Sequence, residues 1–225
     1  MRKAIVTGSS RGLGEALARQ LREAGWDVLG LSRADGVDLS SVDALSTWLG
    51  RGTLEQFLAE ATDVVLVNNA GTVGPVAEVG AQSPDAISEA VTLNVTAPLV
   101  LTDAVVRHRP AGVPVRVVHI SSGAGRHPYP TWSVYCATKA AVDMHALALA
   151  EEGIDGVRAA SVAPGIVDTD MQASIRETEG FPLRDTFIGY KESGALSSPD
   201  DAAAKILRLI ESPDFGTSPV TDVRG

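Results

Sequence analysis

Short apolar runs alternate with longer amphipathic stretches along the whole chain, and this alternation limits the folds that the chain can adopt. Short, continuous apolar runs are typical of parallel strands that are covered on both faces. We expect such strands at residues 4–7, 28–32, 64–67, 115–120, 157–162 and 220–223. Strands that alternate with helices predict right-handed crossovers and a parallel sheet. The predicted fold class is therefore α/β, with a doubly wound parallel sheet flanked by helices.

Several helices have recognisable starts, and nothing in the composition divides the chain. Residues 12–24 predict a helix with leucines along one stripe and a glycine just past its end. Ser83 and Ser198 each precede a proline and acidic residues, the pattern of a capped helix N-terminus. We therefore expect one domain over residues 1–225. Its most polar part, with many glycines and prolines, is residues 168–198, which we interpret as a mobile flap over a site.

The charge and the cysteine content exclude several classes of partner and location. The chain carries 28 acidic and 19 basic residues, for a net charge of −9, and has no run of Lys or Arg. Nucleic acids and anionic membrane surfaces are therefore not expected as partners. The single cysteine, Cys136, cannot form an internal disulfide, which favours a reducing compartment. The N-terminal apolar run is too short for a signal peptide, and we saw no apolar stretch approaching about 18 residues, so we expect a soluble cytoplasmic protein.

A glycine-rich turn follows the first predicted strand and opens directly into a helix. It reads Thr7-Gly-Ser-Ser-Arg-Gly-Leu-Gly14, with the spacing G-x-x-x-G-x-G. Glycines in this position let the backbone approach a pyrophosphate, and the helix N-terminus presents unpaired N–H groups to it. The alternative is an ordinary strand-to-helix turn, but the position after the first strand of a βαβ unit favours a dinucleotide. The residues expected to contact it are Gly8, Ser10, Arg11, Gly12, Leu13 and Gly14.

The end of the second predicted strand bears on the choice of cofactor. An acid about 20 residues after the glycine turn favours NAD, whereas an arginine there favours NADP. Counting alone nominates Asp35, but Ser32 and Arg33 occupy the carboxyl end of the strand. Arg11 could reach the same ribose, and two guanidinium groups suit a 2′-phosphate. The alternative is that both arginines are solvated surface residues. We favour NADP(H) as the cofactor over NAD(H).

A tyrosine and a lysine stand four residues apart in a predicted helix, at Tyr135 and Lys139, and share one face of it. A nearby cation can lower the pKa of a phenol by about 1–3 units, toward the range useful for proton transfer. Alone, such a pair is often a chance occurrence. Ser122, however, follows the strand at 115–120, and ligands of α/β sheets bind at the carboxyl ends of strands. Its hydroxyl could bind the substrate oxygen that Tyr135 protonates.

Two asparagine-containing segments complete the candidate site. Asn68-Asn-Ala-Gly71 follows the strand at 64–67, where small residues leave room for a flat ring. Asn94 lies in a largely apolar helical stretch and is either a satisfied core residue or a site residue.

Six segments in this order resemble the short-chain dehydrogenase/reductase family over nearly the full length of the chain. They are TGSSRGLG at 7–14, NNAG at 68–71, the helix around Asn94, ISS at 120–122, YCATK at 135–139 and PGIVDT at 164–169. The resemblance implies a single Rossmann-like domain with a seven-stranded parallel sheet and a nicotinamide cofactor. The compact form is similar to the sepiapterin-reductase-like and benzil-reductase-like members.

The same resemblance implies roles for individual residues. The catalytic tetrad would be Asn94, Ser122, Tyr135 and Lys139. In such enzymes the tyrosine is the acid–base group, the serine positions the carbonyl, the lysine holds the ribose and lowers the tyrosine pKa, and the asparagine holds a water molecule. Further cofactor contacts would be Asn69, Ala70 and Gly71 on the adenosine side, and Pro164, Gly165, Val167 and Thr169 near the nicotinamide.

One segment departs from the family pattern. Asp38-Leu39 matches the pair that contacts adenine, but it follows Arg33 so closely that there is room only for a loop. The family usually has a helix and then a third strand in this place. We therefore expect the second helix to be deleted and the third strand to be shortened.

The sequence leaves two interpretations open for several other polar and aromatic residues: contact with substrate, or packing. Those between Ser122 and Tyr135 either edge a pocket for a flat carbonyl compound or pack; they are His127, Tyr129 and Trp132. Those in the flap either close over substrate or anchor the flap; they are Met171, Phe181, Phe187 and Tyr190. Cys136 is interpreted as core. No metal is expected, because the other histidines, at 108, 119 and 145, lack the spacing of metal ligands.

The expected function is the NADPH-dependent reduction of a ketone or aldehyde, or the reverse oxidation of an alcohol. The alternatives are a non-catalytic protein that senses NADP(H), and an epimerase or dehydratase like those of longer relatives. An intact tetrad opposes the first alternative, and the lack of a C-terminal substrate domain opposes the second. The alanine-rich helix at 137–150 favours a homodimer or homotetramer, since such helices form the subunit interfaces of this family.

Overall fold

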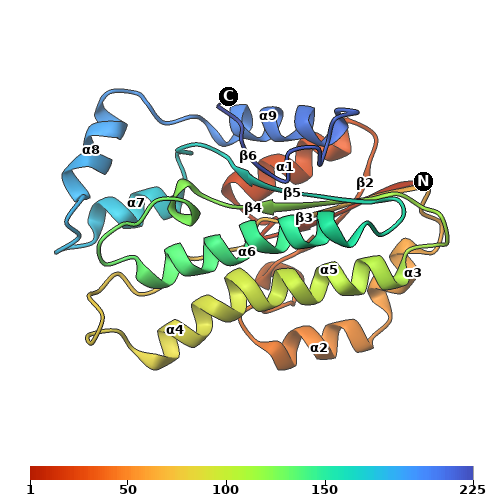
Figure 1. Cartoon of the computed structure of the whole chain (residues 1–225), viewed down its shortest axis with the longest axis horizontal. Coiled ribbons are helices and arrows are strands. Elements are labelled where there is room, and N and C mark those ends of the chain that lie inside the picture. Colours follow the sequence, from red (N-terminus) through yellow and green to blue (C-terminus); the bar gives the residue numbers. More distant parts are fainter. Residues whose placement is uncertain (225) are drawn as a thin grey trace.

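A parallel sheet forms the centre of the computed structural model, which describes residues 1–224 (Figure 1). Within these residues the sheet has six strands in the order β2-β1-β3-β4-β5-β6. The strands are β1 (Arg2–Thr7), β2 (Asp27–Leu31), β3 (Asp63–Asn68), β4 (Val115–Ile120), β5 (Val157–Ala163) and β6 (Val220–Asp222). The chain starts at an inner strand, β1, and adds β2 on one side and β3 to β6 on the other, as a doubly wound α/β fold does. The predicted fold class is confirmed.

The sheet lacks the third strand that the family resemblance predicts. After β2 the chain makes one 3₁₀ turn, Arg33–Asp35, so the second helix is absent, as expected. The expected short strand around Asp38 is not formed either, and the prediction of seven strands is wrong for the described residues. The reason is local: the Asp38 carboxylate accepts hydrogen bonds from the backbone N–H and hydroxyl of Ser40, which bend the chain toward the next helix. β2 is therefore an edge of the sheet.

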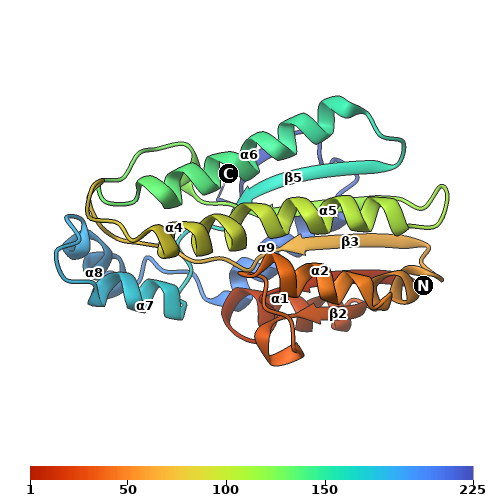
Figure 2. The same cartoon turned by 90° about the horizontal axis from the view of Figure 1, so that it is seen from below.

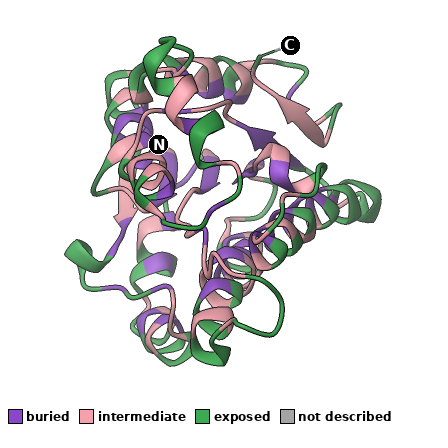
Figure 3. Cartoon of the chain, turned by 90° about the vertical axis from the view of Figure 1, so that its left-hand side faces the viewer, coloured by how far each residue is buried: buried purple, intermediate pink, exposed green. Residues whose placement is uncertain are grey.

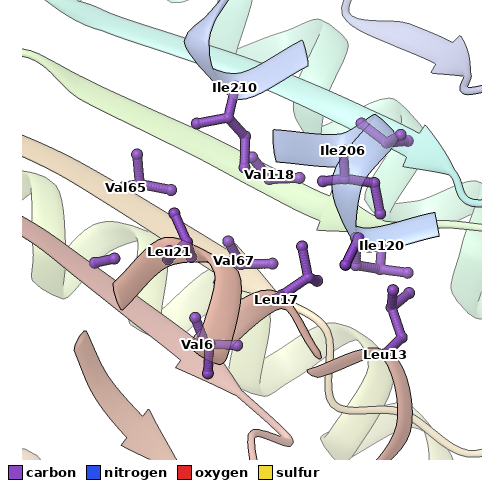
Figure 4. Close-up of a cluster of buried hydrophobic side chains, with 14 of the residues drawn as sticks. Val6, Leu13, Leu17, Leu21, Val65, Val67, Val118, Ile120, Ile206 and Ile210 are labelled. Atoms are coloured by element: carbon purple, nitrogen blue, oxygen red, sulfur yellow. The ribbon is translucent and has the colours of Figure 1, made fainter. Parts of the chain in front are cut away.

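Helices cover both faces of the sheet, and alternate strand residues point to each face. On one face, Val6, Val67 and Val118 pack under α1 (Gly12–Glu23) and α9 (Pro199–Glu211) (Figure 4). On the other face, strand residues such as Leu66 pack against α5 (Ala97–His108) and α6 (Ser133–Glu152). The helices α2 (Val42–Gly50) and α3 (Thr53–Leu58) cover the same face near β2. Because both faces are buried, the strands read as continuous apolar runs.

Two serines that were predicted to cap helices behave differently. Ser198 precedes α9, and its hydroxyl accepts a hydrogen bond from the backbone N–H of Asp201 at 3.0 Å, as predicted. Ser83 precedes α4 (Pro84–Val91), but its side chain makes no capping hydrogen bond. The position of this helix start was right, whereas the hydroxyl contributes nothing to it.

The helix α4 continues through one turn of π-helix, Thr92–Thr96, into α5, and the three form one rod (Figure 2). By length and composition this rod, Pro84–His108, is the one helix in residues 1–224 that is apolar enough to cross a membrane, with a mean hydropathy of 1.3. We had expected no such stretch, because scattered polar residues interrupt its apolar runs. Its residues Ala97, Leu101 and Val105 are buried against the sheet, which is the position of a core helix.

The predicted flap, residues 168–198, contains α7 (Asp170–Glu177) and α8 (Arg184–Glu192). Its two ends lie side by side, since Val167 and Ser197 form a parallel bridge and the backbone N–H of Asp168 donates to the carbonyl of Ser197 at 2.9 Å. Both helices lie beyond the carboxyl ends of the strands (Figure 1). Seen from that end, the strands are buried in the middle and exposed residues gather on the outer faces of the helices (Figure 3).

Candidate active site

A cleft of about 430 Å³ lies at the carboxyl ends of β1 to β5. All the cofactor contacts expected from the sequence line it, and so does Ser122. These are Gly8, Ser10, Arg11, Gly12, Leu13, Gly14, Arg33, Asp38, Leu39, Asn69, Ala70, Gly71, Tyr135, Lys139, Pro164, Gly165, Val167 and Thr169. The topology brings them together because all the strands are parallel, so their carboxyl ends meet at one edge of the sheet.

The glycine turn packs so closely that its shape depends on missing side chains. A Cβ atom on Gly14 would lie 2.2 Å from the carbonyl oxygen of Gly8 and 2.4 Å from Nδ2 of Asn69. Gly8 itself has a φ of 66°, in the region that favours glycine. Asn69 fastens the turn to β3 by donating from Nδ2 to the carbonyl of Thr7 at 2.9 Å. The turn therefore places its backbone and the start of α1 on the cleft.

The N-terminus of α1 fits an anion. Arg11 stands at its cap position, and its side chain makes no capping hydrogen bond to the first N–H groups. Such N–H groups and the helix dipole favour a phosphate group. The residues present thus fit the pyrophosphate of a dinucleotide.

Charged residues of both signs lie around the part of the cleft next to β2, and Asp38 is among those that line it. Arg33 lines the cleft, and within residues 1–224 it forms no salt bridge. Asp35 does not line it, because its carboxylate accepts from the hydroxyls of Ser32 at 2.6 Å and Ser9 at 3.4 Å. Arg11 lines the cleft but pairs with Asp170 of the flap at 2.9 Å. An arginine, rather than Asp35, therefore faces the cleft next to β2.

Tyr135 and Lys139 lie on the face of α6 that borders the cleft, and both are buried, with 7% and 6% exposure. Lys139 donates from Nζ to the carbonyl of Ile120 at 2.7 Å, and Nζ lies 5.7 Å from the centre of the Tyr135 ring. Burial raises the pKa of Tyr135 to about 12, while hydrogen bonding with the Ser122 hydroxyl lowers it. Burial lowers the pKa of Lys139 to about 8, while the charge of Asp143 raises it.

The direction of the tyrosine shift corrects the expectation from the sequence. The lysine was expected to lower the pKa of the phenol, but the loss of water around the ring outweighs any such effect. The physical reason is the geometry of the lysine, whose ammonium group bonds to the Ile120 carbonyl rather than to the phenol. Tyr135 is therefore protonated near neutral pH, which suits a proton donor.

Asn94 lies behind the cleft rather than on it. It is buried in the π-helical turn, and its Oδ1 accepts from the backbone N–H of Thr72 at 2.9 Å. Its Nδ2 donates to the carbonyl of Thr72 at 2.8 Å and to Oγ1 of Thr138 at 3.0 Å. The side chain thus joins the segment after β3 to the helix that carries Tyr135 and Lys139, and its amide hydrogens and oxygen are already bonded.

The aromatic residues beside the cleft pack together. Trp132 stacks on Phe181 of the flap with ring centres 4.9 Å apart, and it meets the Tyr135 ring edge-on at 5.4 Å. Phe187 joins the same group. None of the three phenylalanine and tryptophan side chains lines the cleft. Trp132, Phe181 and Phe187 therefore pack, and their packing connects the flap to the helix of Tyr135. Met171 of the flap, for which the sequence left the same two interpretations, lines the cleft.

Cys136 and two of the histidines have partners away from the lining of the cleft. Cys136 is partly buried, with Sγ 3.8 Å from the carbonyl oxygen of His127. His119 is buried in β4 and hydrogen-bonds through Nε2 to Nδ1 of His145 at 3.0 Å. Burial lowers the pKa of His119 to about 3. No three His, Cys, Asp or Glu side chains in residues 1–224 are grouped to hold a metal ion.

The cleft also has lining residues that the sequence did not single out for a role in the site. They are Leu31, Ser32, Val37, Ser40, Thr72, Glu89, Leu93, Ile120, Ser121, Asp170 and Gln172. Ser121 directly follows a predicted strand, so the strand-end rule could have found it, and Thr72 directly follows the predicted segment 68–71. Glu89 and Leu93 come from the helical rod, and no local pattern marks which of its faces reaches the cleft.

These features define a nucleotide-binding α/β enzyme of the oxidoreductase type, and comparison with known proteins identifies the family. The family model for short chain dehydrogenases matches residues 51–180. The chain is 36% identical to the benzil reductase ((S)-benzoin forming) of Bacillus cereus, over 96% of each protein. It is 32% identical to the sepiapterin reductase of Xenopus laevis, over 94% of this chain and 91% of that protein. The chain belongs to the short-chain dehydrogenase/reductase family.

Solved structures agree with this assignment. A short-chain dehydrogenase/reductase from Burkholderia vietnamiensis is 40% identical, with a TM-score of 0.68, over 100% of this chain and 99% of that one. A short chain dehydrogenase from Burkholderia cenocepacia, in complex with NADP, is 25% identical, with a TM-score of 0.75, over 100% and 98% of the two chains. A nicotinamide cofactor and chemistry at a CH–OH or C=O group follow from the family.

Proposed function

We propose that this protein is an NADPH-dependent reductase of a ketone or aldehyde, and that it also oxidises the corresponding alcohol. The observation that carries the proposal is the arrangement of Ser122, Tyr135 and Lys139 on one cleft with the glycine turn of α1. A cleft that accepts a dinucleotide beside a proton donor is what carbonyl reduction needs.

Each residue of the proposed site has a task that its environment supports. Bound NADPH supplies the hydride for the carbonyl carbon. Tyr135 donates the proton from Oη to the carbonyl oxygen, since burial keeps its phenol protonated. The Ser122 hydroxyl donates to the same oxygen, and the Lys139 ammonium group, held by the carbonyl of Ile120, would bind the ribose of the cofactor. Asn94 fixes the segment at Thr72, which lines the cleft.

The preference for NADP(H) over NAD(H) rests on Arg33. Arg33 lines the cleft beyond β2, whereas the Asp35 carboxylate accepts hydrogen bonds from Ser32 and Ser9. A carboxylate that faced the ribose would repel a 2′-phosphate, and an arginine attracts it. The complex of the Burkholderia cenocepacia relative with NADP is consistent with this preference.

The proposed substrates are small carbonyl compounds with a flat or apolar body. The names of the two relatives, benzil reductase and sepiapterin reductase, support this class. We further propose a homodimer or homotetramer in the cytoplasm. Met144 and Leu147 of α6 are 63% and 39% exposed, and a second copy of the chain would cover them.

The test is a panel of ketones, diketones and quinones assayed with NADPH and NADH, for the wild type and for Tyr135→Phe. We expect Tyr135→Phe to keep its affinity for NADPH and to lose nearly all turnover, because only the donated proton is removed. Tyr190→Phe is the matched control, since Tyr190 belongs to α8 and does not line the cleft. Equal turnover in wild type and Tyr135→Phe would reject the assignment. If the wild type bound NADPH but reduced no compound, the sensor hypothesis would replace it.

A further inference from the structure

A buried carboxylate, Asp143, lies one helical turn after Lys139 on α6 and outside the lining of the cleft. It is 7% exposed, which is rare for an aspartate and requires partners. Its Oδ1 accepts from the Ser161 hydroxyl at 2.6 Å, and its Oδ2 accepts from Nε of Arg126 at 3.2 Å. Neither the family motifs nor the fold alone explains why a charge is kept here.

The two partners come from different elements, so the carboxylate connects parts of the site. Ser161 belongs to β5, and Arg126 follows the 3₁₀ turn Gly123–Gly125. Arg126 also donates from Nη2 to the carbonyl of Thr221 in β6 at 3.0 Å. Asp143 thus holds α6 against β5 and, through Arg126, against the chain that leaves Ser122.

The turn that begins at Ser122 rests directly on α6. Ser122 caps this turn, with Oγ accepting from the backbone N–H of Ala124 at 3.2 Å. A Cβ atom on Gly125 would lie 2.8 Å from Oδ2 of Asp143 and 3.0 Å from the carbonyl carbon of Lys139. The distance between the Ser122 loop and the helix of Tyr135 is therefore set at the Asp143 carboxylate.

The charges around Lys139 make Asp143 important in a second way. Residues at positions i and i+4 of a helix share a face, so Asp143 lies on the same face of α6 as Lys139, whose ammonium group donates to the carbonyl of Ile120. The other titratable neighbours on α6 and β4 are Tyr135 and the His119–His145 pair, all of which are neutral at neutral pH because burial disfavours their charged forms.

The remaining elements packed on α6 bring few charges. Arg126 belongs to the Ser122 loop and forms a salt bridge with Asp143 at 3.2 Å. From β6 comes Asp222, which pairs with Arg224 at 2.7 Å. From α4 comes Glu89, which lines the cleft. Within residues 1–224, burial lowers the Lys139 pKa and the charge of Asp143 raises it.

We propose that Asp143 is a positioning residue that keeps the Lys139 side chain an ammonium ion and holds the Ser122 loop against α6. It acts through Lys139 and Arg126 and touches neither substrate nor cofactor. The inference rests on the proposed function, which gives Lys139 and Ser122 their tasks. The part that concerns the charge of Lys139 can be measured without turnover.

The first experiment titrates the lysine side chains by NMR in protein labelled with ¹³C-lysine. The chain has lysines only at positions 3, 139, 191 and 205, and Lys139→Arg assigns the signal of interest. We expect Asp143→Asn to lower the Lys139 pKa by about one unit or more, because the nearby negative charge is lost. Ser161→Ala is the control: it removes one hydrogen bond and keeps the charge, so the shift should be much smaller. An unchanged Lys139 pKa in Asp143→Asn would overturn the proposal.

A second variant keeps the proposal testable if Asp143→Asn does not fold. Arg126→Gln removes the positive neighbour of the carboxylate, so more of its charge acts on Lys139. We expect the Lys139 pKa to rise, the opposite direction to Asp143→Asn. No rise in Arg126→Gln would count against the proposal.

The second experiment measures kcat/KM for carbonyl reduction against pH. If Lys139 must be charged, the limb of the profile that reports it should move to lower pH in Asp143→Asn by the shift seen in the NMR titration, while Ser161→Ala keeps the wild-type midpoint. A purely structural role would lower kcat/KM at every pH and leave the midpoint in place, which would overturn the proposal. If the wild type reduced nothing, the proposed function would fail, and the NMR titration would still decide the role of Asp143.

Discussion

Replacing Gly14 by alanine tests whether the glycine turn is shaped by close backbone packing. The added Cβ would lie 2.2 Å from the carbonyl oxygen of Gly8 and 2.8 Å from its carbonyl carbon. Both atoms are backbone, so no flexible side chain can move aside. Overpacking of this kind costs about 3 kcal/mol at the upper end of its usual range. Alanine in a helix returns about 1 kcal/mol relative to glycine.

The expected net loss for Gly14→Ala is therefore about 2 kcal/mol in the free energy of unfolding, or about 4–8 °C in Tm for a chain of this size. The backbone must shift to relieve the contact between the added Cβ and Gly8, and this shift moves the start of α1. We therefore expect the affinity for NADPH to fall as well. Urea unfolding followed by circular dichroism measures the first effect, and calorimetric titration with NADPH measures the second.

Gly189→Ala provides the matched control. Gly189 is an interior residue of α8, and a Cβ atom there would meet nothing within 4 Å. We expect this variant to gain up to about 1 kcal/mol from helix propensity. If Gly14→Ala proved as stable as Gly189→Ala and bound NADPH normally, the argument from close packing would be refuted.

Two further predictions concern the charged and titratable groups. Arg33→Ala should weaken NADPH binding at least tenfold and NADH binding little, because only NADPH carries the 2′-phosphate; equal losses in calorimetric titrations would show that Arg33 does not read that group. The free energy of unfolding should fall as the pH drops below about 6.5, by up to about 1.4 kcal/mol per pH unit, because His119 is neutral in the folded protein and binds a proton when unfolded. Urea titrations between pH 7 and pH 5 measure this slope, and an equal slope in His119→Gln would contradict the assignment.

The strands and the position of the cleft could be predicted from the sequence because both depend on local pattern. Strands buried on both faces are continuous apolar runs, and β4 lies where such a run predicts it. The site followed from one rule, that parallel strands end at one edge, which is why Asn69 and Ser122 border the same cleft.

What could not be predicted depends on contacts between distant segments. Residues 1–224 form no seventh strand, because hydrogen bonds from Ser40 to Asp38 turn the chain away from β2, and the motif Asp38-Leu39 does not reveal this turn. The direction of the Tyr135 pKa shift depends on burial by surrounding elements, which spacing along a helix cannot give. The stacking of Trp132 on Phe181 joins residues far apart in the sequence. The sequence shows that both aromatic residues are present, but not that they pack against each other.

The bridge between Val167 and Ser197 makes the flap a closed loop with a fixed neck. Because its two ends are already held together beside β5, a longer or shorter loop changes the closure entropy by only about 0.6 kcal/mol per doubling of its length. A change in length after residue 172 therefore costs little closure entropy and leaves in place the residues at 169–172 that line the cleft. The segment is thus divided in two: its start belongs to the nucleotide cleft, and the part after residue 172 can vary in length while the cleft keeps its lining.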